Sequence, residues 1–159
     1  NIIKAVGAWK NLPVKQLWEI RLAEDRIIEF NVRMVVADKI EVDRMQTNLM
    51  LSEIYSQWIT DKTKGSFPLF KGEIDDDWDY VGPGINNIEH IGVTENMRGE
   101  YFLPSIIFSS QKPNSGWTFN IINSDIYHRG RVLQSLNKSE IELSPGEYPF
   151  FNGRIYIKV

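Results

Sequence analysis

A short acidic stretch, DDDWDYVGPG, holds the residues whose types and spacing are best suited to chemistry. It places Asp75, Asp77 and Asp79 at alternate positions. Carboxylate oxygens on alternate loop residues can converge on one hard cation, which is how calcium loops begin. An EF-hand loop also needs glycine at its sixth position and glutamate at its twelfth, where this chain has Tyr80 and Asn86. A looser calcium site at the three aspartates therefore stands beside the alternative of a solvated acidic loop.

The same carboxylates suit a paired-carboxylate hydrolase, with one residue of Asp75–Asp79 and either Glu89 or Glu95 as acid and base across a cleft. The other catalytic signals are missing from the sequence. Neither His90 nor His128 has a second histidine or cysteine at ligand spacing, and no nucleophile elbow or glycine-rich phosphate loop is present. We therefore expect a protein that is not an enzyme and that binds no cofactor other than calcium.

Aromatic side chains form the second group of candidates. Rings exposed on loops and edge strands can stack on sugar rings or anchor a protein partner. The candidates for an interface or a ligand contact are Trp78, Tyr80, Trp117, Tyr127 and Tyr148. Because aromatic residues in short strands usually pack inward, we expect most of these rings in the core and one or two on the surface.

Composition narrows the class of protein. A chain of 159 residues with 42% hydrophobic residues is sufficient for one compact domain. The net charge of −3 lacks the clustered basic residues that nucleic acids require, so we expect no sequence-specific nucleic-acid binding. No apolar run approaches the roughly 18–20 residues of a membrane-spanning helix, and we expect no membrane partner. Cysteine is absent, which excludes disulfides and cysteine zinc sites.

Hydrophobic periodicity predicts a hairpin followed by a helix. Apolar and polar residues alternate over 16–22 and again over 28–36, on either side of a short polar break, which is typical of a β-hairpin. From Asp38 the apolar residues recur at spacings of three to five, and no glycine or proline interrupts them before Gly65. This pattern predicts one amphipathic helix over about 41–61. Residues 1–13 are compatible with either a short helix or a strand.

Beyond Pro68, short β-prone runs are separated by turn signals such as GPG, KPNSG and SPGEYP. This spacing favours a mostly antiparallel sheet or small sandwich. The predicted fold class is therefore α+β, with the helix packed on the sheet. We predict a single β-rich domain over 1–159, in which 14–64 form the hairpin and helix and 66–159 form the turn-rich β part.

Residues 28–59 combine an alternating strand, a polar linker and the predicted helix. Short motifs mark these parts: Val36, Ala37, Asp38 and Lys39 end the strand, Asp43 and Arg44 form the linker pair, and Leu51, Ser52 and Glu53 lie in the helix. This segment resembles the strand-then-helix segment of tail-terminator and tail-completion proteins of tailed bacteriophages. The resemblance implies a small α+β domain with the helix packed across a sheet. It also implies assembly into a homo-oligomeric ring that contacts other tail and connector proteins in the virion.

Two functions of different classes follow from the sequence. The first is a non-enzymatic structural protein of a phage tail or connector, with the acidic stretch as a lumen or interface loop. The second is a carbohydrate-binding or adhesive β-domain, secreted or at the cell surface and stabilised by calcium, which the strands after Pro68 and the rings of Trp78, Tyr80 and Trp117 favour.

Overall fold

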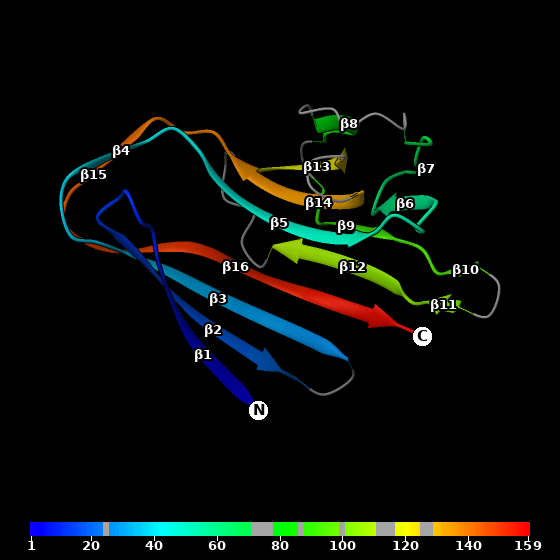
Figure 1. The fold of residues 1–159 in the computed structure, drawn as a ribbon, viewed down its shortest axis with the longest axis horizontal. Helices are drawn as coiled ribbons and strands as arrows, with labels where there is room; N and C mark the ends of the chain where they lie inside the picture. The colour runs from blue at the N-terminus through cyan, green and yellow to red at the C-terminus, as the bar shows by residue number, and fades with distance from the viewer. Residues whose placement is uncertain (24–25, 71–77, 86–87, 99–100, 111–116, 125–128) are drawn as a thin grey trace.

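The computed structural model describes residues 1–159 except for 24–25, 71–77, 86–87, 99–100, 111–116 and 125–128 (Figure 1). The described residues contain sixteen β-strands and no helix. The strands are β1 (Ile2–Ala8), β2 (Val14–Leu22), β3 (Ile27–Val36), β4 (Ile40–Val42), β5 (Met45–Ser52), β6 (Gln57–Thr60), β7 (Lys64–Ser66), β8 (Trp78–Ile85), β9 (His90–Val93), β10 (Asn96–Arg98), β11 (Tyr101–Leu103), β12 (Ser105–Ser110), β13 (Trp117–Ser124), β14 (Gly130–Asn137), β15 (Ile141–Leu143) and β16 (Gly146–Lys158).

These strands form two main antiparallel sheets. The large sheet has the order β1-β2-β3-β16-β12-β9-β6-β7, and the smaller sheet has the order β5-β14-β13-β8. Two short ribbons, β4 with β15 and β10 with β11, complete the described fold. Strands from both ends of the chain meet in the large sheet, because β16 lies between β3 and β12.

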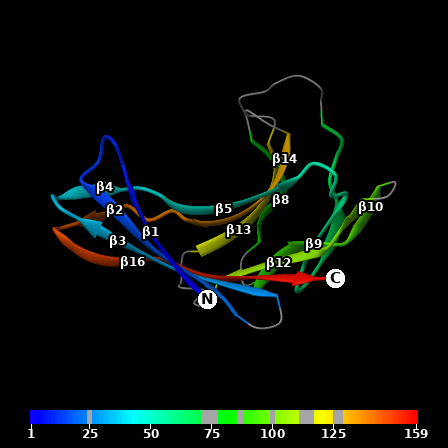
Figure 2. The same ribbon diagram turned by 60° about the horizontal axis from the view of Figure 1, so that its bottom comes forward.

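One long antiparallel ribbon links the two sheets. β3 pairs with β16, β4 pairs with β15, and β5 pairs with β14, so the same two chain segments stay together from one sheet into the other. Figures 1 and 2 show this ribbon bending at β4 and β15. Under the bend, Val14, Met34, Val36 and Leu143 form a small buried cluster, which gives the bend its own apolar support.

The main core lies where the two sheets face each other. Phe108 of β12 packs edge-on against Phe119 of β13, with ring centroids 6.2 Å apart, and lies 5.6 Å from Phe151 of β16. Alternation along each strand directs these side chains to one face of the sheet. The same core contains Val32, Tyr55, Phe67, Ile88, Ile91, Val93, Ile121, Leu133 and Ile155.

The predicted hairpin is confirmed. β2 and β3 pair in an antiparallel register from Val14 opposite Val36 to Leu22 opposite Ile28. The segment before it, for which the sequence left helix and strand open, is the strand β1, which pairs with β2 along its whole length. The alternation of apolar and polar residues was therefore a sufficient signal for β2 and β3, but not for β1.

The predicted helix over about 41–61 is wrong, and with it the α+β class, because this segment forms β4, β5 and β6 of an all-β fold. In β5, Leu49 and Leu51 are half-buried while Asn48, Met50 and Ser52 are exposed. The helical spacing counted Met50 as part of the apolar face, yet 54% of its surface is exposed. The fold implied by the phage resemblance, a helix packed across a sheet, is likewise absent from the described residues.

The turn that ends β5 contains no glycine or proline, which explains why the sequence pattern predicted one continuous helix over about 41–61. The Ser52 hydroxyl accepts a hydrogen bond from the Ile54 amide at 3.3 Å, and the Ser52 carbonyl accepts one from the Tyr55 amide at 3.3 Å. A serine side chain can make such a turn without glycine or proline. In addition, β5 pairs with β14, a partner far away in sequence whose contribution no local pattern reports.

Candidate functional site

The outer face of the large sheet carries a row of polar residues on three adjacent strands. In β9, β12 and β16, Ile91, Phe108 and Ile155 point into the core, and the residue preceding or following each of them points outward. Ser109 lies directly opposite His90 on one side and Arg154 on the other. Strand pairing therefore brings an imidazole, a hydroxyl and a guanidinium together from distant parts of the chain.

A second row forms an apolar floor beside these polar groups. Gly92 lies opposite Ile59 of β6 and Ile107 of β12, and Ile107 in turn lies opposite Tyr156 of β16. A Cβ atom on Gly92 would lie 2.4 Å from the Ile106 carbonyl oxygen and 2.7 Å from Cδ1 of Ile107. A side chain at Gly92 would thus displace Ile107 and the β12 backbone.

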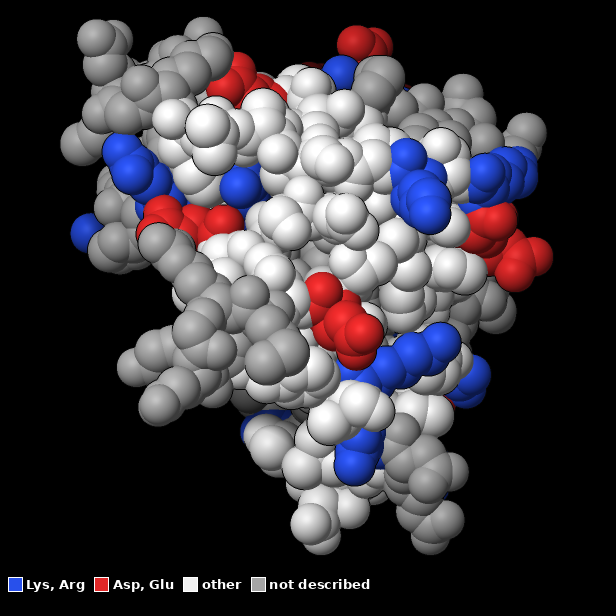
Figure 3. All heavy atoms as spheres, turned by 90° about the vertical axis from the view of Figure 1, so that its right-hand side faces the viewer, with Lys and Arg blue, Asp and Glu red and all other residues white. Residues whose placement is uncertain are grey.

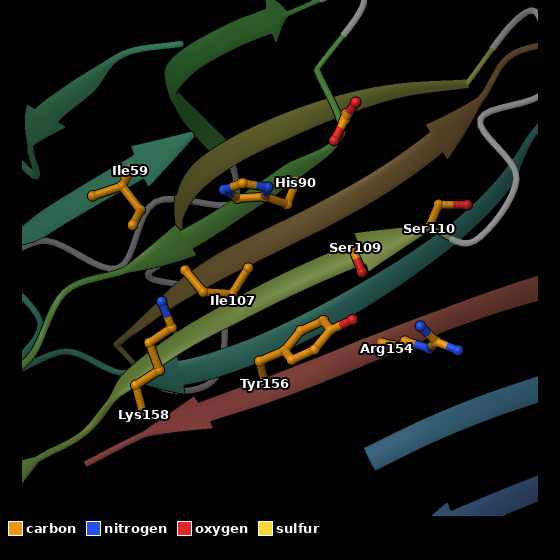
Figure 4. Close-up of a pocket in the computed structure, with 9 residues that line it drawn as sticks. Ile59, His90, Ile107, Ser109, Ser110, Arg154, Tyr156 and Lys158 are labelled. Carbon is orange, nitrogen blue, oxygen red and sulfur yellow. The ribbon is translucent and has the colours of Figure 1, made fainter. Parts of the chain in front are cut away.

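The two rows line one open groove of about 800 Å³. Its lining residues are Ile59, Glu89, His90, Ile107, Ser109, Ser110, Arg154, Tyr156 and Lys158. Figure 4 shows Arg154, Tyr156 and Lys158 in succession along β16, with Ser109 and Ile107 on the next strand and His90 beyond them. We call this surface the sheet groove.

The sheet groove has a fixed cation at each end of its β16 wall. Arg154 forms an ion pair with Glu29 of β3 at 2.9 Å, and Lys158 is exposed. A hydrogen bond with the Tyr156 side chain, and then the negative charge of Glu29, raise the pKa of the Arg154 guanidinium. Arg154 therefore stays charged at every physiological pH.

The sheet groove brings together side chains of several kinds that can bind a ligand. Ser109 and His90 are neighbours across the strand pair, yet no hydrogen bond joins them among the hydrogen bonds of the described residues. The arrangement presents hydroxyls, an imidazole, a carboxylate and two cations around an apolar floor, which are complementary to a polar ligand.

Of the predicted calcium ligands, Asp75 and Asp77 lie outside the described residues, as does Tyr127 of the aromatic candidates. Asp79 is in β8, where its backbone pairs with Asn123 of β13. Within the described part of the chain, no group of three or more histidine or acidic side chains is placed to hold a metal ion. Of the two glutamates considered for a hydrolase, Glu89 lines the sheet groove and Glu95 is an exposed residue before β10.

The remaining aromatic candidates do not come together. Trp78 and Tyr80 lie in β8, where the Tyr80 side chain is exposed; the Trp78 side chain is not among those described. Tyr148 of β16 is half-buried, and its hydroxyl donates a hydrogen bond to the Ser144 carbonyl at 2.8 Å. Trp117 is half-buried at the start of β13, with its ring centroid 6.4 Å from that of Phe151. Tyr80, Trp117 and Tyr148 are not among the described residues that line the sheet groove.

Trp117 does line a smaller hollow next to the sheet groove. This hollow, of about 180 Å³, is lined by Asn31, Val32, Met45, Ser110, Trp117, Asn137, Pro149, Phe150, Phe151 and Asn152. Ser110 belongs to both linings, so the two hollows are adjacent. An indole among several amides is suitable for a polar ring such as a sugar.

The groove residues were missed as a set by sequence reasoning, although part of the signal is visible. In RIYIKV, Arg154, Tyr156 and Lys158 alternate with apolar residues and so must share the outer face of a strand. His90 has no second histidine or cysteine at ligand spacing, so the sequence does not mark it as a site residue. What the sequence does not contain is the order of β16, β12 and β9 in the sheet, which alone brings these residues together.

Three further findings concern the surface charge, membrane spans and the comparisons with known proteins. Figure 3 shows Lys and Arg interspersed with Asp and Glu over the described surface of one end of the molecule, without a continuous basic field. In the described part of the chain there is no helix with the length and apolar character of a membrane span. Comparison with protein-family models, with curated proteins and with solved structures finds no match to this chain.

Proposed function

We propose that this protein is a non-catalytic binding domain that holds an acidic glycan across the outer face of the large sheet. The observation that carries the proposal is the sheet groove, an open hollow that combines polar side chains of both hydrogen-bonding kinds with an apolar floor. Sugars present hydroxyls at their edges and apolar C–H groups on their ring faces, and they are bound by such mixed surfaces.

The charges of the lining favour an acidic sugar over a neutral one. Arg154, which pairs with Glu29, and Lys158 are fixed cations, while Glu89 is the one carboxylate among the described residues of the lining. A guanidinium binds a carboxylate or sulfate through paired N–H donors, and a lysine contributes a flexible point charge. A uronic acid or a sulfated sugar therefore suits this groove better than a neutral hexose.

The shape of the surface favours a polymer. The groove runs over β6, β9, β12 and β16 on a sheet face, and the hollow at Trp117 adjoins it through Ser110. Several sugar units of one chain could therefore contact the protein at once, with Tyr156 as an aromatic platform in the sheet groove and Trp117 as a second one. Sharing the binding energy among adjacent units is an advantage for a repetitive ligand.

Binding to a panel of immobilised polysaccharides tests this proposal. The panel contains polygalacturonate, alginate and dextran sulfate, with dextran as the neutral counterpart, each with and without calcium. We expect binding to at least one acidic polymer, weakened by salt because charge contributes to it. Tyr156→Ala should lower the affinity about tenfold, which is the loss expected for one stacking platform. Failure of the protein to bind any acidic polymer would overturn the proposal.

Assembly into a virion, as the phage resemblance implies, stays a second proposal. It is favoured by the large aliphatic side chains that β1 exposes, since these could serve subunit contacts. A closed ring requires a head-to-tail contact between two different surfaces. The mass of the protein in solution tests this second proposal, because a ring has several subunits, whereas glycan binding does not require an oligomer.

A further inference from the structure

The strand β1 is an unusually open edge of the large sheet. It pairs with β2 along its seven residues, and no strand lies on its other side in the described part of the fold (Figure 1). Unpaired backbone N–H and C=O groups on such an edge are ready to accept another strand. The opposite edge of the same sheet, β7, is only three residues long and so offers far less to pair with.

Exposed aliphatic side chains distinguish β1 from the other sheet edges. Ile2, Ile3 and Val6 are 58%, 53% and 67% exposed. Ile2 and Val6 lie on the outer face with Arg21 and Leu17 opposite them, and Ile3 lies on the inner face opposite Ile20. The edge strand β5 exposes one large apolar side chain, Met50, and the register of β8 is interrupted twice, which hinders regular pairing.

We propose that β1 pairs with β1 of a second copy of this chain, antiparallel and about a two-fold axis. A register that uses all seven residues places Ala5 on the axis, opposite Ala5 of the second copy. It then places Ile2 opposite Ala8 and Ile3 opposite Gly7. Each isoleucine therefore faces a small residue, so this part of the strand is complementary to itself in size.

Lys4 is the one charged residue of β1, and this register accommodates it. A lysine on an edge strand commonly opposes pairing with other chains. Here Lys4 lies opposite Val6 of the second copy, so no like charges are directly opposed. Its ammonium group is 3.8 Å from the Glu19 carboxylate on β2, which offsets the charge within its own sheet.

The pairing also has a consequence for binding, which rests on the glycan proposal. A two-fold axis perpendicular to the sheet keeps both outer faces on the same side. The sheet grooves of the two copies would then open in the same direction along one continuous sheet. A polymer that reaches both grooves is held by both, which raises its apparent affinity without any new contact within a groove.

The mass of the full chain in solution, measured by light scattering over about 1–100 μM, tests the pairing by mass action. We expect a monomer–dimer equilibrium. Two substitutions at one position test the register. Val6→Lys places a lysine opposite Lys4 of the other copy, twice because of the two-fold axis, and should weaken the dimer roughly tenfold. Val6→Glu places a carboxylate opposite Lys4 and should preserve the dimer. A monomer throughout this range overturns the proposal, as does equal loss with both variants, which indicates unspecific apolar contact.

A cysteine on the axis gives an independent test, because the chain has no cysteine of its own. Residues directly opposite in antiparallel strands have Cα atoms roughly 4.5–5.5 Å apart, which a disulfide can span. Ala5→Cys should therefore form a covalent dimer on oxidation, whereas Leu12→Cys, exposed on the hairpin turn beyond β1, should not. Equal cross-linking of both variants contradicts the register. Neither result depends on glycan binding, so a failure of the pairing is distinguishable from a failure of the glycan proposal.

Discussion

The two faces of the large sheet are built from the same strands and have different roles: one packs in the core and the other lines the sheet groove. Toward the core, Ile91 and Phe108 are almost completely buried. On the opposite face, the adjacent residues His90 and Ser109 line the sheet groove. Because the side chains of a strand alternate between faces, stability and binding are assigned to neighbouring residues of the same strand. Substitution of adjacent residues should therefore separate the two properties, and the predictions below test how complete that separation is.

The largest effect should come from removing the central ring of the core. Phe108→Ala deletes the ring that contacts both Phe119 and Phe151, so we expect a loss of about 3–5 kcal/mol in the free energy of unfolding. Denaturant unfolding measures it. The neighbouring Ser109→Ala removes a half-buried hydroxyl from the outer face and should leave the unfolding midpoint almost unchanged. Comparable destabilisation by the two variants would contradict the separation of the faces.

A buried arginine should produce the next largest effect. Arg131 of β14 donates hydrogen bonds to the Tyr55 carbonyl at 3.0 Å and the Pro68 carbonyl at 3.1 Å, and its guanidinium lies over the rings of Phe67 and Phe70. Arg131→Met keeps most of the volume but leaves these carbonyls without that donor, and should cost about 2–4 kcal/mol. Thermal and denaturant unfolding measure it. A stability equal to that of the parent protein would show that the network is dispensable.

Gly92 is a position where one substitution should lower both the stability of the fold and the affinity for glycan. Gly92→Ala forces Ile107 and the β12 backbone to move, which should cost about 1–3 kcal/mol and also disturb the floor of the sheet groove. We therefore expect lower stability together with lower glycan affinity. Gly146→Ala is the matched control, because its Cβ would make only ordinary contacts with Tyr148, the nearest at 3.5 Å. Unchanged binding by Gly92→Ala would show that the floor does not contribute to affinity.

Tyr55 should give a smaller effect that depends on pH. Burial raises the pKa of its phenol, and its hydroxyl donates to the Pro104 carbonyl at 2.7 Å. The folded state therefore retains this proton more strongly than the unfolded state, so the stabilisation is complete below the ordinary phenol pKa and is lost as the pH rises above it. Tyr55→Phe should cost about 1 kcal/mol at neutral pH and show a shallower decline in alkali. Identical alkaline profiles would contradict this role.

The hairpin and the helix show how far local sequence patterns extend. The alternation in β2 and β3 identified both strands, because each of them presents one regular apolar face. In β5 the pattern was misleading, since Met50 is exposed although apolar and the turn at Ser52 contains neither glycine nor proline. The pairing with β14 decides the conformation of that segment, and this long-range contact has no local signature.

The candidate site, too, could be predicted from the sequence only in part. Arg154, Tyr156 and Lys158 follow from the alternation at the end of the chain, so one wall of the sheet groove was accessible from the sequence. The other wall was not, because it depends on the order of strands in the sheet. The composition of the acidic stretch predicts a calcium site, but Asp75 and Asp77 lie outside the described residues, so this role stays a prediction.

The most direct test of the glycan proposal compares two arginines on the outer face of the large sheet. Arg154 pairs with Glu29 and lines the sheet groove, whereas Arg33 pairs with Glu147 and does not. Titration calorimetry with the acidic polymer that binds best should show at least a tenfold loss of affinity for Arg154→Gln and little change for Arg33→Gln, at equal unfolding midpoints. Equal affinities of the two variants would contradict the assignment of binding to the sheet groove.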